Sequence, residues 1–204
     1  ANTTLIKSEN GWIVVDPLTS LETTTAAMKF AEQHLGKINL TGVVFTHSHA
    51  DHFAGILSLT TSDGAAKKGI PIIAPAGFIQ EATSENIIAG PAMTRRGSYM
   101  FGSALDHSVT GHVDAGLGKQ VVFGSISIIP PTVSIDQPLV ALNVDGIDFE
   151  FYNMPGSEAP AELTFYLPKW KAFCGAEILS HVMHNVLTLR GAKVRDALLW
   201  SDYI

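Results

Sequence analysis

A dense group of polar side chains, Thr46-His47-Ser48-His49-Ala50-Asp51-His52, directly follows an apolar run of the sequence. Side chains two residues apart on an extended segment point the same way, so His47 and His49 can reach one ion. The turn that follows swings Asp51 and His52 towards a second. Imidazole nitrogens and a carboxylate oxygen together suit zinc, and also manganese or iron. A loop of solvated histidines gives no reason to combine His-x-His with Asp-His, so the segment predicts a metal centre.

The elements predicted before this segment are those that would hold it in place. Strand, strand, helix and strand patterns cover residues 3–7, 11–17, 20–35 and 40–46. The helix follows the capping-box pair Thr19 and Glu22, carries an apolar face, and ends at Gly36. The polar segment begins where the last of these strands ends. This order predicts an α/β fold, in which functional side chains gather at the ends of strands.

The rest of the chain divides at a long stretch that is poor in regular patterns. Further elements are predicted as a helix starting within 52–60, strands over 71–75, 139–144, 146–152, 164–167 and 172–175, a weak helix over 77–88, and a terminal amphipathic helix over 191–204. Residues 89–131 are rich in Gly, Ser and Thr. They are predicted to form an extended insertion or a set of loops, which is uncommon in a compact domain and often functional.

Composition limits the class of protein. The chain has 204 residues, 46% of them hydrophobic and 16% charged, which is enough for a packed core in one domain or at most two. A net charge of −6, with no basic cluster beyond Lys67-Lys68 and Arg95-Arg96, argues against nucleic-acid binding. No apolar run approaches the ~18 residues of a membrane span, so we expect a soluble chain. Its compartment, bacterial periplasm, exterior or cytoplasm, is left open. Because Cys174 is the lone cysteine, any metal must be held by His, Asp and Glu.

The run from His47 to His52 resembles the His-x-His-x-Asp-His signature of the metallo-β-lactamase superfamily. This resemblance implies a four-layer αββα sandwich with metals at the edge between its two sheets. The strand closed by Pro17, the helix to Leu35 and the strand into Thr46 fit the lead-in of that fold. Most members of the superfamily complete the first metal with a distant histidine and bridge both metals with an aspartate. The second half of this sequence offers no such pair.

Two later segments, from Asn153 to Glu162 and from Cys174 to Glu177, are instead similar to the alkylsulfatase branch, in which glutamates take these two roles. Stretches over 16–20, 95–102 and 184–197 are similar as well, so the resemblance spans nearly the whole chain. The ligands that it implies are His47, His49 and Glu158 for a first zinc, Asp51 and His52 for a second, and Glu177 as the bridge.

The resemblance implies hydrolysis of an alkyl sulfate ester to an alcohol and sulfate. Two zinc ions would activate a bridging hydroxide by lowering the pKa of water from about 15.7 towards about 7, and the hydroxide would attack either sulfur or the ester carbon. Arg190 offers a planar fork for two sulfate oxygens, Asn185 is a second donor, and His184 could protonate the leaving alkoxide. The alternatives are a solvated Arg190, and an exposed polar helical face that carries His184 together with Glu177 and His181.

The resemblance also implies that this is only part of a larger protein. The family completes its second zinc with a histidine well beyond the glutamate pair, and the sequence ends at Ile204 before that position. We therefore expect residues 1–204 to be a partial catalytic domain that is incomplete at both ends. The family's helical dimerisation domain and C-terminal sterol-carrier-like domain would be missing, and the full-length protein would be a homodimer. Rival interpretations are a hydrolase of the same fold that acts on a lactam, lactone or thioester, and an inactive metal-binding fragment.

Four other residues with reactive side chains receive structural interpretations. Glu162 is predicted to be a solvated turn carboxylate, in preference to a partner of a metal-bound histidine. His107 and His112 are expected at the surface of the long loop, and Cys174 inside an apolar strand.

Overall fold

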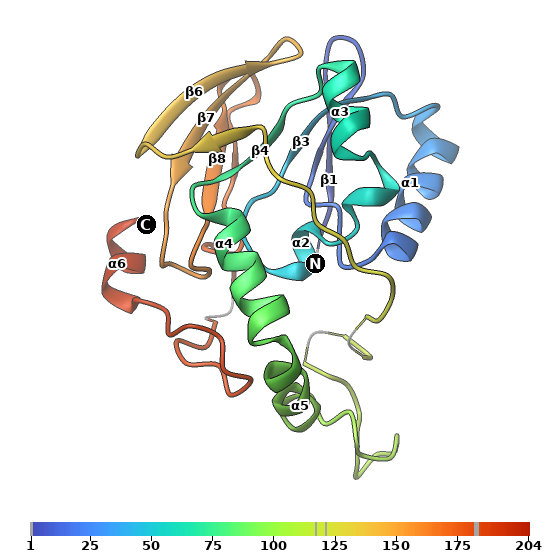
Figure 1. Ribbon diagram of the computed structural model, residues 1–204, viewed down its shortest axis with the longest axis vertical. Coiled ribbons are helices and arrows are strands. Elements are labelled where there is room, and N and C mark those ends of the chain that lie inside the picture. Colours follow the sequence, from blue (N-terminus) through green and yellow to red (C-terminus); the bar gives the residue numbers. More distant parts are fainter. Residues whose placement is uncertain (1, 117, 121, 182–183) are drawn as a thin grey trace.

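The computed structural model describes residues 2–116, 118–120, 122–181 and 184–204. Its strands form two sheets (Figure 1). The five-stranded sheet has the order β1 (Thr4–Lys7), β2 (Trp12–Val15), β3 (Leu40–Val44), β4 (Ile72–Pro75) and β5 (Val133–Ile135). In it β1 is antiparallel to β2, and the remaining neighbours are parallel. The four-stranded sheet is antiparallel throughout, in the order β6 (Leu139–Val144), β7 (Ile147–Asn153), β8 (Leu163–Leu167) and β9 (Ala172–Cys174).

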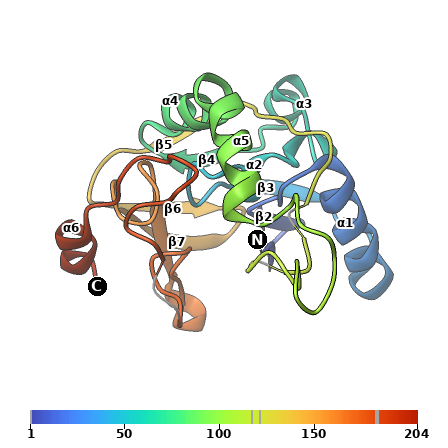
Figure 2. The same ribbon diagram turned by 90° about the horizontal axis from the view of Figure 1, so that it is seen from below.

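Most helices lie on one side of the five-stranded sheet, and the four-stranded sheet lies on the other (Figure 2). The helical elements are α1 (Leu21–Leu35), α2 (Ala50–Phe53), a 3₁₀ turn η1 (Ile56–Ser58), α3 (Ser62–Lys68), α4 (Phe78–Thr83), a π-helical turn η2 (Ser84–Ile88), α5 (Gly90–Met100), a 3₁₀ turn η3 (Pro168–Trp170) and α6 (Ala197–Asp202). The layers of a sandwich with mixed α and β elements are therefore present, as the sequence predicts.

Two apolar cores hold these layers together. Between the sheets, β7 alternates buried Ile147, Phe149 and Phe151 with more exposed residues, as a strand covered on one face does. On the helical side, the Phe45 ring stacks on the Phe78 ring with centroids 5.0 Å apart. The parallel strand β4 is buried at all four positions because it is covered on both faces. The site described below lies where the two sheets meet.

Several predicted boundaries are wrong, for identifiable local reasons. The cap of α1 is Ser20 and not Thr19: the Ser20 hydroxyl accepts from Thr23 N, and Thr23 Oγ1 accepts from Ser20 N. Within the predicted loop region 89–131, the stretch Gly90–Met100 is helix α5, whose mostly polar surface gives little apolar periodicity. The terminal helix is shorter than the predicted 191–204, because Asp196 caps it and so sets its first turn at Ala197.

The outer face of the four-stranded sheet has exposed apolar side chains, Leu139 and Phe173 among them. Helix α6 contacts the loops at the end of this sheet: Trp200 Nε1 donates to Ile178 O, and Tyr203 Oη donates to Pro155 O. None of the described helices has the length and apolar character needed to cross a bilayer.

Candidate metal centre

The histidine-rich segment lies at the edge between the two sheets. The backbone after β3 continues as a bridge to the start of β8, in which Leu163 N donates to Thr46 O and Ser48 N donates to Ala161 O. This extended stretch places His47, and the chain then turns at His49 into the short helix α2. The first turn of α2 carries Asp51 and His52. All three histidine side chains are buried, whereas Asp51 is partly exposed.

The two glutamates reach the same place from the other sheet. Glu158 lies in the loop between β7 and β8 and is 2% exposed. Glu177 follows β9, in a turn next to Ala176, whose φ is +47°. Residues 175–181 form turns and bends and not the helix considered from the sequence; the predicted helical face that joins Glu177 and His181 to His184 runs through residues 182–183, which lie outside the described residues.

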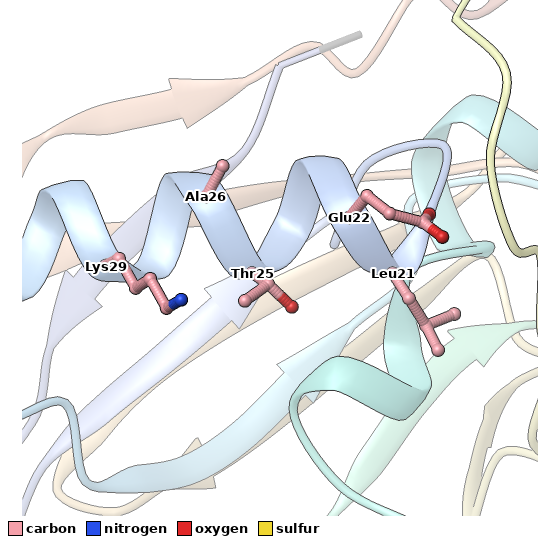
Figure 3. Close-up of a pocket in the computed structure, with 5 residues that line it drawn as sticks. All are labelled: Leu21, Glu22, Thr25, Ala26 and Lys29. Atoms are coloured by element: carbon pink, nitrogen blue, oxygen red, sulfur yellow. The ribbon is translucent and has the colours of Figure 1, made fainter.

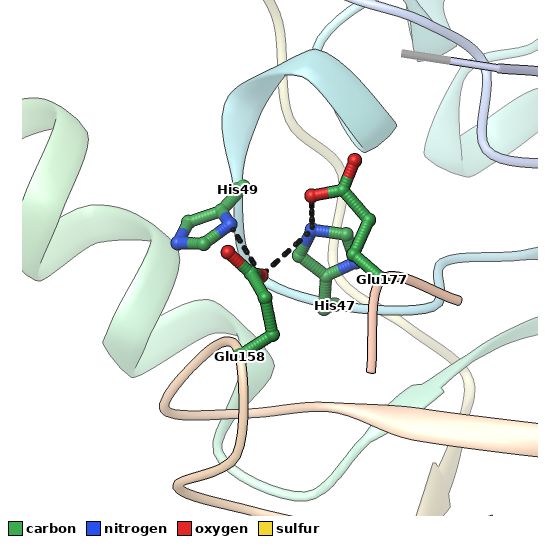
Figure 4. A group of neighbouring side chains, drawn as sticks. All are labelled: His47, His49, Glu158 and Glu177. Carbon is green, nitrogen blue, oxygen red and sulfur yellow. Dashed lines mark ion pairs between the residues drawn. The ribbon is translucent and has the colours of Figure 1, made fainter. Parts of the chain in front are cut away.

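His47, His49, Glu158 and Glu177 point towards one another (Figure 4). Glu158 Oε2 is 3.0 Å from His49 Nδ1 and 3.7 Å from His47 Nε2. Glu177 Oε2 is 3.8 Å from His47 Nε2. One ligand atom from each of the four residues lies within 4.8 Å of the others.

A second group shares Glu177 with the first. Glu177 Oε1 is 3.3 Å from His52 Nε2, and Asp51 Oδ2 is 3.4 Å from the same nitrogen. The two oxygens of one carboxylate therefore face two different histidines, His47 and His52. His184 lies at the rim, with its Nε2 3.6 Å from Glu177 Oε2.

The donor atoms of both groups suit metal ions. His47 Nε2, His52 Nε2 and Glu158 Oε2 are buried, and none has a hydrogen-bond partner among the described residues. Leaving such atoms unpaired is costly unless something binds them. Two ligands of a tetrahedral zinc ion, each about 2.0–2.1 Å from it, lie roughly 3.3 Å apart, which is close to the separations observed. The residues present therefore fit cations between the imidazoles and the carboxylates.

Asp16, at the end of β2, orients His52 directly and His47 through Thr46 by hydrogen bonds. Its Oδ2 accepts from His52 Nδ1 at 2.8 Å and from Thr46 Oγ1 at 2.6 Å, and its Oδ1 accepts from Thr46 N. Thr46 Oγ1 is in turn 2.9 Å from His47 Nδ1. A proton on His52 Nδ1 leaves Nε2 free to face the cluster. Asp16 is not among the site residues predicted from the sequence, although an Asp-Pro pair at the end of a buried strand is a visible signal.

Burial and neighbouring charges shift the pKa values of the three histidines in different directions. Burial, with His52 and His49 nearby, holds the pKa of His47 well below its usual value, so its ring is neutral. Burial lowers the pKa of His49, but the carboxylate of Glu158, whose Oε2 lies 3.0 Å from Nδ1, outweighs it and raises the pKa. Asp16 likewise overcomes burial and holds the pKa of His52 well above the ordinary value.

Two interpretations of surface residues are wrong. Glu162 is fully buried: its Oε2 accepts from Ser157 Oγ and Ala159 N, which fixes the loop that carries Glu158. Burial, and secondarily the charge of Glu158, raises the pKa of Glu162 to about 8.

His112 is also buried, and its Nε2 lies 3.0 Å from Phe101 O, whereas His107 is exposed as expected. Cys174 is half-buried, and burial raises the pKa of its thiol to about 11.

The predicted sulfate-binding residues, Asn185 and Arg190, follow Glu177 closely in the sequence but are not part of the ligand cluster. Asn185 is exposed and Arg190 is half-buried. The described hydrogen bonds and ion pairs include none between either side chain and the six candidate ligands. His184, by contrast, contacts the cluster, because its Nε2 lies 3.6 Å from Glu177 Oε2.

A shallow hollow elsewhere on the molecule has no comparable chemistry (Figure 3). It runs along one face of α1 and is lined by Leu21, Glu22, Thr25, Ala26 and Lys29. The Glu22 carboxylate accepts from Ser125 N and Oγ, so it is already bound to the loop that carries Ser125.

Comparison with known proteins agrees with the fold and the histidine motif. The profile of the metallo-β-lactamase superfamily matches residues 1–203. The chain belongs to the metallo-β-lactamase superfamily. Its members depend on metal ions, and the cluster of His, Asp and Glu lies in this chain at the edge between the sheets.

Within the superfamily, the chain is similar to alkylsulfatases along its whole length. It is 40% identical to an alkyl/aryl-sulfatase of Saccharomyces cerevisiae, covering 100% of this chain and 32% of the relative. It is also 40% identical to a linear primary-alkylsulfatase of Pseudomonas sp., of which it covers 30%. A solved stereoselective inverting sec-alkylsulfatase from Pseudomonas sp. superposes with a TM-score of 0.94 at 39% identity, covering 100% of this chain and 32% of that one. The chain spans about a third of the length of these relatives.

Proposed function

We propose that the cluster binds two metal ions, and that both are zinc. The first is held by His47, His49 and Glu158, and the second by Asp51 and His52, with Glu177 bridging the two. The support is the set of buried, unpaired donor atoms that face one another, and the two oxygens of Glu177 that face different histidines. Imidazole and carboxylate together are an ordinary zinc ligand set.

The function that this geometry supports best is hydrolysis of alkyl sulfate esters to an alcohol and sulfate. The observation that carries it is the meeting of Glu158 and Glu177 with the histidine motif, at positions where the resemblance to alkylsulfatases implies glutamates. Histidine and aspartate take these positions in most of the superfamily. The alkylsulfatase relatives at 40% identity agree with this assignment.

Bound zinc would supply a nucleophile at neutral pH, because it lowers the pKa of water from about 15.7 to about 7. The residues of the chain do the rest. Arg190 and Asn185 lie outside the ligand cluster, in a segment whose backbone at Asn185 is joined to the Glu158 loop through Arg195, and their proposed role is to bind the sulfate oxygens from there, the guanidinium through its planar fork. His184, beside Glu177, donates a proton to the leaving alkoxide if the S–O bond is the one that breaks; cleavage of the C–O bond instead expels sulfate, which needs no such proton. General acid help of this kind contributes about 10² to 10⁴ in rate.

An assay of released sulfate tests the proposal. The zinc-loaded protein is offered dodecyl sulfate and a short secondary alkyl sulfate, with a chelator-stripped sample as the control. We expect sulfate and alcohol in equal amounts from the loaded protein only. In isotopically labelled water, label in the alcohol identifies cleavage of the C–O bond, and label in the sulfate identifies cleavage of S–O. The proposal would be overturned if neither ester were hydrolysed, whether or not the protein hydrolysed a lactam, lactone or thioester instead.

Metal affinity should rise with pH, because protons compete for two of the histidines. The raised pKa values of His49 and His52 mean that each ring keeps its proton to a higher pH than an ordinary histidine. Each ring must lose a proton to bind a cation, so binding strengthens as the pH climbs through these values and weakens below them. We expect the zinc dissociation constant, measured against a chromophoric chelator, to keep falling as the pH rises above the ordinary histidine pKa of about 6.5. A constant that does not change with pH, once corrected for the chelator, would contradict this.

A further inference from the structure

Arg195 is a buried cation beside the cluster that the proposed function does not use. Its side chain is 7% exposed, and its described partners are Glu158 and the backbone of Asn185. Nη2 donates to Glu158 Oε1, Nε donates to the backbone oxygen of Glu158, and Nη1 donates to the backbone oxygen of Asn185. One guanidinium thus joins the Glu158 loop to the segment that carries Asn185 and Arg190.

The contact with Arg195 gives the two oxygens of the Glu158 carboxylate different surroundings. Oε1 is occupied by the guanidinium, whereas Oε2 is buried, has no hydrogen-bond partner among the described residues, and faces His49 and His47. A guanidinium fork that holds both the carboxylate and the backbone oxygen of one residue leaves that side chain little freedom to rotate. The free oxygen is therefore aimed at the histidines before any cation binds.

The backbone around Arg195 and Glu158 is fixed as well. Arg195 N donates to Val186 O, and Asp196 N donates to Gly156 O, each at 3.0–3.1 Å. On the other side of the loop, the buried Glu162 carboxylate accepts from Ser157 Oγ and Ala159 N. Glu158 is thus held between two fixed stretches of backbone. Among the described residues, only the Arg195 side chain hydrogen-bonds to its carboxylate.

We propose that Arg195 is a positioning residue that holds Glu158 as a one-oxygen ligand of the first cation and ties that ligand to the backbone at Asn185. The inference rests on the proposed function for the metal site but goes beyond it, because it assigns a role to a residue outside the ligand set. Partners that orient metal ligands typically contribute about 10- to 100-fold to metal affinity.

Metal affinity of substituted proteins tests this role without any substrate. Arg195→Gln removes the charge and the fork, and we expect the affinity of the tighter zinc site, measured by chelator competition, to fall about 10- to 100-fold. Arg195→Lys keeps the charge, but its single nitrogen cannot reach the three acceptors that three guanidinium nitrogens now contact, so its loss should be smaller than that of Arg195→Gln and its fold retained. The matched control is Lys193→Gln, two residues away, whose amine pairs with Glu81 at 2.5 Å, outside the cluster. We expect unchanged affinity for it.

A double substitution separates positioning from a general effect on the fold. Once Glu158→Gln has removed the ligand, adding Arg195→Gln should lower zinc affinity little further, because both changes remove the same interaction. Losses that multiply independently, or folded Arg195→Gln and Arg195→Lys proteins with normal affinity, would overturn the role of Arg195 and leave the sulfatase proposal standing. An unsubstituted protein that binds no cation would overturn both. Normal zinc binding without sulfate release would overturn only the proposed function.

Discussion

Glu158→Gln will cost the protein its first metal ion while leaving the fold in place. The amide oxygen can still accept from Arg195, so the buried guanidinium keeps a partner. The amide nitrogen then faces His49 and His47, and a neutral NH₂ group does not bind a cation. We expect the affinity of the first site to fall by more than the about 100-fold that loss of an orienting partner costs, and sulfate release to fall with it.

The measurement for Glu158→Gln is the zinc-to-protein ratio after equilibration with limiting zinc, together with the thermal midpoint of the metal-free protein. Glu32→Gln, in an exposed part of α1, is the matched control and should behave as the unsubstituted protein does. Unchanged metal content in the Glu158→Gln protein would show that another residue completes the first site.

Asp16→Asn should remove the second metal ion through an effect on His52. An amide at this position presents NH₂ where Oδ2 now accepts from His52 Nδ1, so two donors would face each other. The ring then favours the tautomer with its proton on Nε2, the atom that faces Asp51 and Glu177. Asparagine suits the backbone there, because Asp16 has a φ of +56°, a conformation that Asn tolerates.

The expected result for Asp16→Asn is one bound zinc in place of two, and a loss of unfolding free energy of about 1–3 kcal/mol from the disturbed buried hydrogen bonds. Metal analysis at limiting zinc and urea unfolding measure these two quantities. Asp148→Asn, at an exposed position of β7, is the control. Two ions bound with normal affinity to the Asp16→Asn protein would refute the role of Asp16 in setting the His52 tautomer.

The part of the site that the sequence predicts best is the part that is local in the chain. His47, His49, Asp51 and His52 follow one strand, so their spacing alone indicates that they converge. Glu158 and Glu177 come from the other sheet, and only the resemblance to alkylsulfatases singled them out. Asp16 and Arg195 were missed because their partners are distant in sequence, as the contact of Asp16 with His52 across 36 positions illustrates.

The errors in the fold have a similar origin. Glu162 was predicted to be solvated because its turn sequence, Ala159-Pro160-Ala161, gives no sign that the next residue bridges to His47 in the opposite sheet. Helix α5 has too polar a surface for its periodicity to stand out among Gly, Ser and Thr. The short edge strand β5 (Val133–Ile135) was not predicted. The other strands and α1, whose apolar patterns face a core, lie within a few residues of their predicted positions.

An anomalous difference map at the zinc edge, from crystals of the zinc-loaded protein, tests most directly whether both glutamates share cations with the histidine motif. We predict two peaks, one within bonding distance of His47, His49 and Glu158, and one beside Asp51 and His52, with a Glu177 oxygen directed at each. A map in which the carboxylate of residue 158 or 177 lies away from every peak would contradict the proposed site, and the sulfate-ester assignment with it.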